Sequence, residues 1–397
     1  MADGLGIGAV IQEVKFRMVD TNSQAQSVML VTTELRAGGT ERCVTELATR
    51  LNPNQFACQV VSVAPFPKER TQFYDRLKSR NIPLFSLNAS SAWSFMKAKR
   101  LLAEHLERVR PQVVLSFLFH ANVLTAYALK RCPEIPHLAN IRVADPRRWR
   151  LPIERQSIRR AIKVICVSEA VKQHCLEVGH YPTNKLVVIP NGVDLLELDH
   201  QLTEPVATNV TSSFPTHSDG GPHIGFGGRL DAQKGLDSLL RCWPALIQKF
   251  PNAQLWVAGE GPQRTELEAQ ARKLGLAPKI HWLGWQREPW NVLKHCQVLV
   301  FPSRWEGMSN ALLEGMATGK PVVANEIEGV QEVLGEGPRA QLAQVDEPNS
   351  LVRNVTQILS DQELTAQCGR FNRQRIQQHY SIEGMIQRFT ELVEAAV

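Results

Sequence analysis

Residues 301–323, FPSRWEGMSNALLEGMATGKPVV, decide the fold because they join a strand end, a loop, a helix and the next strand in one short span. The pattern predicts a strand at 298–301, a loop at 302–309, a helix at 310–317 and a strand at 321–324. In an open α/β sheet, ligands bind in the crevice beyond the carboxyl ends of the strands. The free amides and positive dipole end of the following helix suit an anion such as a diphosphate.

Two glutamates flank this junction between loop and helix. Glu306 precedes the helix and Glu314 lies about one turn inside it, so both side chains can face one ligand held at the helix start. Carboxylates there would accept hydrogen bonds from ribose or sugar hydroxyls. A glutamate in the first turn of a helix is also often only a surface residue favoured by the dipole, and spacing alone leaves that alternative open.

Glycine-rich loops follow two other predicted strands. The strand at 27–33 leads through ELRAGGT into a helix from Glu41, and Gly38 and Gly39 lie in this loop. The second loop, GGRLDAQKG at 227–235, follows a strand from His223 and leads into a helix at 236–250. The order of strand, glycine loop and helix is typical of a phosphate site.

Strands alternate with helices along most of the chain, which predicts parallel, doubly wound sheets. The length of 397 residues suits two domains. Residues 201–221 are rich in Thr, Ser, Pro and Gly, as in a linker. We therefore predict a loose leader at 1–26, a first domain at 27–200, the linker at 201–221 and a second domain from 222.

Composition is that of a soluble globular protein, with 43% hydrophobic and 21% charged residues. No apolar run approaches the roughly 18 residues that a membrane span needs, and the leader resembles neither a signal peptide nor an anchor. The eight cysteines include no C-x-x-C pair, which predicts buried or free thiols in a reducing compartment. We expect a cytoplasmic protein.

Basic residues concentrate in one region of the first domain. Residues 93–172 hold sixteen Lys and Arg against six Asp and Glu, within a chain of net charge +6. This region includes an aromatic and basic helix at 93–108 and the run Arg147, Arg148 and Arg150. It can be a solvated face, a site for an anionic acceptor or a surface that docks on an anionic membrane. Nucleic acid is the weakest alternative because no nucleic-acid-binding motif accompanies the charge.

These sequence motifs resemble those of a known family. EGMSNALLEGMATGKPVVA is similar to the Glu-x₇-Glu signature of retaining glycosyltransferases of family 4 (glycosyl transferases group 1), whose GT-B fold has two facing Rossmann-like domains. GGTER, SFLFHANVLTAYALK, VSE, IPNGVD and GGRLDAQKG also resemble family phrases, in the expected order. The resemblance implies a second domain at 222–378 and a final helix, 379–397, that returns to the first domain.

Site residues follow from this resemblance. It implies that Arg229 and Lys234 stabilise the departing diphosphate, that Glu306 addresses the sugar, and that Glu314 binds the ribose. His120 would bind the sugar or support catalysis. The catalytic residues implied are His120, Arg229, Lys234 and Glu306, and the donor-binding residues are Gly38, Gly39, Gly228, Arg229, Lys234, Gly259, Gly261, Gly307, Met308, Ser309, Asn310 and Glu314.

The implied activity is transfer of a hexose from a nucleotide sugar, with UDP favoured over GDP, to an acceptor hydroxyl in polysaccharide, lipopolysaccharide or glycolipid assembly. No metal site and no resident cofactor are expected, because Arg, Lys and a helix dipole supply positive charge and the chain lacks Asp-x-Asp. Expected partners are the donor, a glycan or lipid-linked acceptor and the inner face of an anionic membrane, without nucleic acid.

Other activities remain as alternatives. The chain can instead be an epimerase or phosphorylase of the same fold, or an inactive protein that binds nucleotide sugars. An NAD dehydrogenase is disfavoured because the first glycine loop lacks G-x-G-x-x-G.

Overall fold

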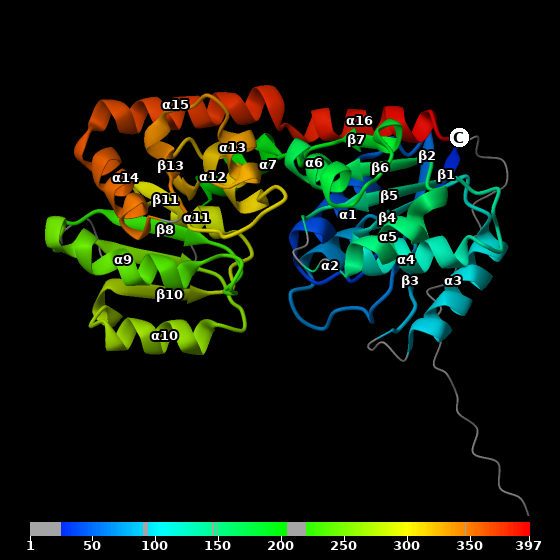
Figure 1. Cartoon of the computed structure of the whole chain (residues 1–397), viewed down its shortest axis with the longest axis horizontal. Coiled ribbons are helices and arrows are strands. Elements are labelled where there is room, and N and C mark those ends of the chain that lie inside the picture. The colour runs from blue at the N-terminus through cyan, green and yellow to red at the C-terminus, as the bar shows by residue number, and fades with distance from the viewer. Residues whose placement is uncertain (1–24, 90–93, 145–146, 148, 205–219, 346) are drawn as a thin grey trace, which may run out of the picture.

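The computed structural model describes residues 25–89, 94–144, 147, 149–204, 220–345 and 347–397. Nearly all of the predicted leader and most of the predicted linker lie outside these residues, as do Trp93 and Arg148. Figure 1 shows two α/β domains side by side, with the last helix, α16 (Ile382–Glu394), lying along the first domain.

The first domain is built on a seven-stranded parallel sheet in the order β3-β2-β1-β4-β5-β6-β7. Its strands are β1 (Gln26–Thr32), β2 (Phe56–Ser62), β3 (Leu84–Ser86), β4 (Val113–Phe117), β5 (His137–Ile141), β6 (Lys163–Cys166) and β7 (Leu186–Val188). Its helices are α1 (Gly39–Arg50), α2 (Gln72–Ser79), α3 (Phe95–Val109), α4 (Leu118–Ala128), α5 (Arg150–Ser157), α6 (Glu169–Glu177) and α7 (Leu195–Thr203), with short 3₁₀ turns at Ile158–Arg160 and Thr183–Lys185.

Helices cover both faces of this sheet because each central strand is apolar on both sides. In β1, Val28 and Leu30 pack on the face covered by α1 and α16, whereas Met29 and Val31 pack on the face covered by α3 and α4. Successive side chains of a strand point to opposite faces, so a continuous apolar run fits a strand that is buried on both sides.

The second domain holds a six-stranded parallel sheet in the order β10-β9-β8-β11-β12-β13. Its strands are β8 (His223–Gly227), β9 (Gln254–Ala258), β10 (Ile280–Gly284), β11 (Val298–Phe301), β12 (Val322–Asn325) and β13 (Leu342–Ala343). Its helices are α9 (Leu236–Lys249), α10 (Arg264–Lys273), α11 (Pro289–Leu293), α12 (Asn310–Ala317), α13 (Glu328–Leu334), α14 (Pro348–Ser360) and α15 (Gln362–His379), with 3₁₀ turns at Ala277–Lys279 and Arg339–Gln341.

The predicted α/β class and parallel sheets are confirmed by both domains. The predicted bounds of β11 and α12 match the structure, whereas α1 begins at Gly39, two residues before the predicted start, because Gly38 takes the N-cap position. The helix predicted at 93–108 is α3, and its buried side includes Leu102 and Leu106. Most of its apolar side chains therefore pack in the core of the first domain.

The chain connects the two domains at α16 as well as through α7. Ser381 N-caps α16, and Ile382 N donates to Val193 O at 3.0 Å while Val193 N donates to Tyr380 O at 2.8 Å. From there α16 buries its apolar face in the core of the first domain. A second apolar cluster joins residues of α6 and α7 to residues of α12 and α13. The facing carboxyl edges of the two sheets are thus held close together.

The described part of the chain has no helix with both the length and the hydropathy of a membrane span. All eight cysteines are free and buried, which confirms the prediction of unpaired buried thiols.

Replacing Phe389 tests the importance of α16. Phe389 is fully buried, so we expect Phe389→Ala to lower the free energy of unfolding by about 3 to 5 kcal/mol, the usual cost of a large cavity. The measurement is urea unfolding followed by circular dichroism. Leu196→Ala, at a position that is 80% exposed, is the control and should change the stability by less than about 0.5 kcal/mol. Equal stability of the two variants would show that the packing of α16 against the first domain is not needed for stability.

Candidate active site

A cavity of about 1150 Å³ lies between the domains. Its walls include the loops that follow β1, β8 and β11 and the start of α4 after β4. The strand order reverses between β1 and β4 in one sheet and between β8 and β11 in the other. These reversals are the switch points at which open α/β sheets bind ligands, and here two of them face each other across one cavity.

All the residues predicted to form the site line this cavity, with the exception of His120. His120 lies in the first turn of α4, where its ring is exposed and meets Phe119 edge-on at 5.3 Å between centroids. The structure therefore brings together the predicted donor-binding residues and places the predicted sugar-binding histidine outside the lining.

The loop after β8 contributes two of the cations that line the cavity, Lys234 and Arg229. Lys234 forms an ion pair with Glu306, and its ammonium also lies 3.5 Å from Ser309 Oγ. Arg229 is 62% exposed at its side chain and donates from Nε to Asp231 Oδ2 at 2.5 Å. Lys234, with a side chain 17% exposed, is thus the more enclosed and positioned cation, whereas Arg229 has room to turn toward a ligand.

Glu306 is fixed by several donors. Besides Lys234, Ser303 Oγ donates to Glu306 Oε1 at 3.0 Å and Gln233 Nε2 lies 3.4 Å from Oε2. The Glu306 side chain is only 8% exposed. A carboxylate held in this way presents its remaining lone pairs in a fixed direction, which suits recognition of hydroxyl groups.

The N-terminus of α12 faces the same space. Ser309 is its N-cap, and the Ser309 hydroxyl accepts from Leu312 N at 3.4 Å. The amides at the start of an α-helix lack partners within the helix, so this end offers an anion a positive dipole and hydrogen-bond donors.

The loop before α12 also touches the first domain. Gly307 has no room for a side chain, because a Cβ there would lie 2.4 Å from Arg142 O. Met308 is buried, its sulfur accepts from Asn191 N at 3.3 Å, and Asn310 Nδ2 donates to Gly39 O at 3.1 Å. Met308 and Asn310 were predicted to bind the donor, and the structure shows that both also join the domains.

Other predicted glycines allow close approach between loops. A Cβ at Gly259 would lie 1.9 Å from Gly228 O, and one at Gly261 would lie 2.3 Å from Leu230 O. A Cβ at Gly38 would lie 2.3 Å from a carboxylate oxygen of Glu41, so a side chain there would require the Glu41 side chain to move. These glycines shape the cavity through the backbone.

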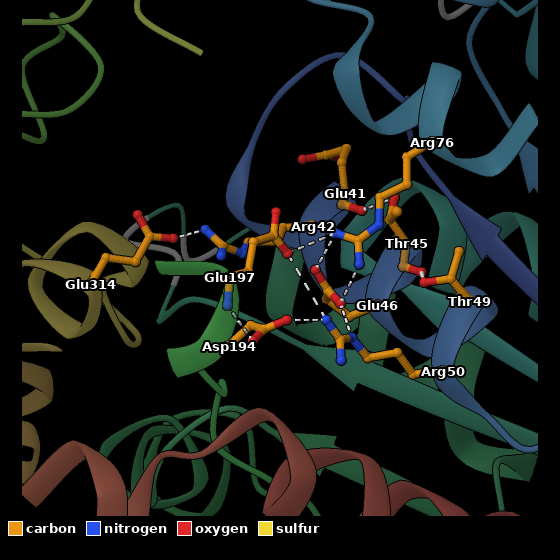
Figure 2. A network of polar contacts seen from close by, with 10 residues as sticks. All are labelled: Glu41, Arg42, Thr45, Glu46, Thr49, Arg50, Arg76, Asp194, Glu197 and Glu314. Atoms are coloured by element: carbon orange, nitrogen blue, oxygen red, sulfur yellow. Dashed lines mark hydrogen bonds and ion pairs between the residues drawn. The ribbon is translucent and has the colours of Figure 1, made fainter. Parts of the chain in front are cut away.

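Glu314 lies in α12 and is 9% exposed. Trp290 Nε1 donates to its Oε2 at 2.5 Å, and Arg42 from the first domain forms an ion pair with its Oε1. Figure 2 shows Glu314 and Arg42 pointing toward each other, with Arg42 at the edge of a larger group of charged residues.

Glu41 is a further acidic group of the cavity wall. The pKa of Glu41 is raised to about 7, mainly by burial and also by the nearby charge of Glu34, while its own backbone amide and the charges of Arg229 and Arg142 oppose the shift. Glu41 therefore changes its charge near neutral pH.

Sequence reasoning did not assign a role to several residues of this site: Glu41, Arg42, Arg142, Asn191 and Trp290. Glu41 and Arg42 end the motif GGTER and Asn191 lies in IPNGVD, and these positions were the available signals. Within the described ranges, no group of three or more His, Cys, Asp or Glu side chains is arranged to hold a metal ion. The site can bind an anion at Lys234 and α12 and can bind hydroxyl groups at Glu306 and Glu314.

Comparison with known families covers most of the chain. Residues 211–375 match the family described as Glycosyl transferases group 1, and residues 37–196 match the one described as Glycosyltransferase Family 4.

Two curated relatives are each 32% identical to this chain. An uncharacterised glycosyltransferase from Methanocaldococcus jannaschii matches over 201 residues, 50% of this chain and 51% of that protein. An N-acetylgalactosamine-N,N'-diacetylbacillosaminyl-diphospho-undecaprenol 4-alpha-N-acetylgalactosaminyltransferase from Campylobacter jejuni matches over 181 residues, 45% of this chain and 46% of that protein. The chain spans about half the length of these curated relatives.

A solved structure of HepE from Anabaena, in complex with UDP and glucose, is similar in fold. Its TM-score is 0.78 at 19% identity, covering 93% of this chain and all of that one. Together with the two parallel-sheet domains, this similarity confirms the predicted GT-B fold.

The raised pKa of Glu41 predicts a pH-dependent stability. The folded protein holds the Glu41 proton more tightly than the unfolded chain, so this contribution to stability is present below pH 4.5 and is lost as the pH rises to about 7. We expect Glu41→Gln to gain stability relative to the wild type over this range, by up to about 3 kcal/mol. Thermal unfolding between pH 4 and 8 measures this difference. Glu363→Gln, at an exposed position, is the control, and parallel curves for wild type and Glu41→Gln would contradict the assignment.

Proposed function

The chain belongs to the glycosyl transferases group 1, and from this premise we propose that it is a retaining, metal-independent hexosyltransferase. Its donor is a UDP-sugar and its acceptor is a hydroxyl group of a growing glycan or glycolipid. The observation that carries this proposal is the meeting of Lys234, Glu306, Glu314 and the start of α12 in one interdomain cavity.

The main barrier to such a transfer is departure of the diphosphate. Lys234, Arg229 and the amides at the start of α12 stabilise the negative charge that builds on the leaving oxygen. Glu314 accepts hydrogen bonds from the ribose and Glu306 accepts them from the sugar. Retention brings the acceptor to the face that the diphosphate leaves, so the departing oxygen takes the acceptor's proton while the new glycosidic bond forms.

These two cations and the dipole of α12 supply the positive charge that a divalent metal supplies in other transferases, which is why we propose metal independence. No resident cofactor enters the scheme, since the nucleotide sugar is a co-substrate. His120 keeps a proposed role in supporting the acceptor or the sugar, although it lies outside the cavity lining.

The donor and acceptor classes draw on the relatives. The HepE complex contains UDP, and the relative from Campylobacter jejuni is named for an acceptor linked to diphospho-undecaprenol. We propose by analogy a UDP-sugar donor, a lipid-linked or glycan acceptor, and action on the cytoplasmic side of a membrane. An epimerase of the same fold and an inactive nucleotide-sugar binder remain alternative functions.

A donor panel tests the proposal. UDP, GDP and their sugars are added to the purified chain, and the melting temperature and release of free sugar are measured. Binding to the folded state raises the melting temperature by linkage. Stabilisation by UDP-sugars with slow release of sugar supports the transferase, and interconversion of the donor sugar without an acceptor indicates an epimerase. If no nucleotide stabilises the chain, the proposed donor site is wrong.

Charge removal in the β8 loop should reduce turnover. In assays containing excess EDTA, we expect Lys234→Ala and Arg229→Ala each to lose about 2 to 4 kcal/mol of transition-state stabilisation, as for one oxyanion-type donor. Lys249→Ala, at an exposed position of the same domain, is the control. Because Lys234→Ala leaves Glu306 without its cation, the melting temperature of each variant is measured alongside its turnover to separate a folding defect from lost catalysis. If both single variants turn over as fast as the wild type, the proposed roles of Lys234 and Arg229 are wrong. If the wild-type enzyme loses its activity in EDTA, the proposal of metal independence is wrong.

The basic region of the first domain leads to a prediction about membranes. Met96 is 64% exposed on α3 beside exposed Lys97 and Arg100, and Trp149, near the start of α5, is 59% exposed. We propose that this surface docks on anionic lipid, where each Lys or Arg contributes about 1 kcal/mol.

Co-sedimentation with anionic and neutral vesicles measures this docking. We expect binding to anionic vesicles at 0.1 M salt and release at 1 M, because the Debye length falls from about 10 Å to about 3 Å. Changing Lys97, Lys99 and Arg100 together to Ser should weaken binding, whereas the matched change of Lys249, Arg272 and Lys273 should not. A wild-type protein that stays in the supernatant at low salt would rule out docking.

A further inference from the structure

One cation of the cavity comes from the first domain and binds a carboxylate of the second. Arg42 lies in α1, one turn past the glycine loop, and its guanidinium forms an ion pair with Glu314 of α12. Figure 2 shows the two side chains extended toward each other from opposite domains. Asn310 makes a second contact between the two domains, since its side-chain amide donates a hydrogen bond to Gly39 O at the start of α1.

The ion pair and the Trp290 hydrogen bond occupy different oxygens of Glu314. Arg42 contacts Oε1 and Trp290 Nε1 donates to Oε2. A carboxylate has about four lone-pair directions, so these two donors fix the plane of the group and leave lone pairs for other donors. Because Glu314 lines the cavity, hydroxyls of a bound ribose would meet a carboxylate whose orientation is already set.

Arg42 is itself supported by carboxylates of the first domain. Burial lowers the pKa of Arg42, while the charges of Glu46, Glu197 and Asp194 favour its cationic form. Glu46 lies one turn further along α1 and is held by ion pairs with Arg50 and Arg76. The cation at the cavity is therefore part of a network within its own domain (Figure 2).

The same network reaches the connection between the domains. Asp194, which Arg50 binds, is the N-cap of α7, and its carboxylate accepts from Glu197 N at 2.9 Å. Helix α7 packs against α11 and α12, which carry Trp290 and Glu314. The residues that support Arg42 and the residues that hold Glu314 are thus connected through one helix.

We propose that Arg42, supplied by the first domain, is a donor-positioning residue: it fixes Glu314 for the nucleotide ribose, so that donor affinity depends on this contact between the two domains. This rests on the proposed function, in which Glu314 binds the ribose.

The experiment measures binding of UDP and 2′-deoxy-UDP by calorimetry to the wild type, Arg42→Gln, Arg42→Lys and Glu314→Gln. We expect Arg42→Gln to weaken UDP binding about tenfold, as loss of a charge-assisted contact does, and Arg42→Lys to restore part of it. The wild type should prefer UDP over 2′-deoxy-UDP, and Arg42→Gln should lose most of that preference. A residue that only stabilises the fold would lower the melting temperature and leave the preference intact.

Arg50→Gln is the matched control. Arg50 lies two turns past Arg42 on the same helix, pairs with Glu46 and Asp194, and does not line the cavity. This variant should lose stability and keep its affinity for UDP within about twofold.

The outcomes separate the two proposals. If Glu314→Gln weakens UDP binding and Arg42→Gln does not, the role of Arg42 is wrong and the donor site stands. If Glu314→Gln also binds UDP and 2′-deoxy-UDP as the wild type does, the ribose site itself is wrong. An Arg42→Gln variant that binds UDP more tightly would overturn the inference, because it would make Arg42 a competitor of the donor.

Discussion

Burial of one face of α16 in the core of the first domain is the constraint on which the rest of the structure depends. Ile382, Met385, Phe389 and Val393 lie among the side chains of the first sheet, although the chain reaches them only after completing the second domain. Together with the apolar cluster around α6, α7, α12 and α13, this packing sets how the two sheets face each other. The cavity is a consequence, since loops of both domains converge where the sheets present their carboxyl edges.

Four charged residues that line this cavity form two ion pairs between a cation and a carboxylate. Lys234 pairs with Glu306 and Arg42 pairs with Glu314. Removing one partner would leave the other charge uncompensated at a largely buried position, which costs several kcal/mol, so pairing lets the fold keep these four charged groups there. A diphosphate bound at Lys234 as proposed would share the cation with Glu306. The positive charge is therefore in place, with its orientation set, before any ligand arrives.

The second domain was predictable because its signals are local. Ser309 marks the start of α12, and apolar runs mark the strands, so β11, α12 and the switch-point loops follow from short stretches. The partners of the site residues were not predictable. Arg42 and Glu314 are distant in sequence, and no local pattern shows that Gly307 lies against Arg142 O or that Met308 lies against Asn191. The placement of His120 outside the lining likewise depends on how α4 packs.

The position of α16 also has a consequence for how the protein folds during synthesis. Strands β1 to β7 emerge from the ribosome long before α16, so the face that it covers stays without its partner while the second domain is made. Contacts between segments this far apart form slowly, and apolar surface exposed in the meantime favours aggregation and chaperone binding. The two domains are therefore not independent folding units. The first domain completes its native core only when α16 has been synthesised and packs against it.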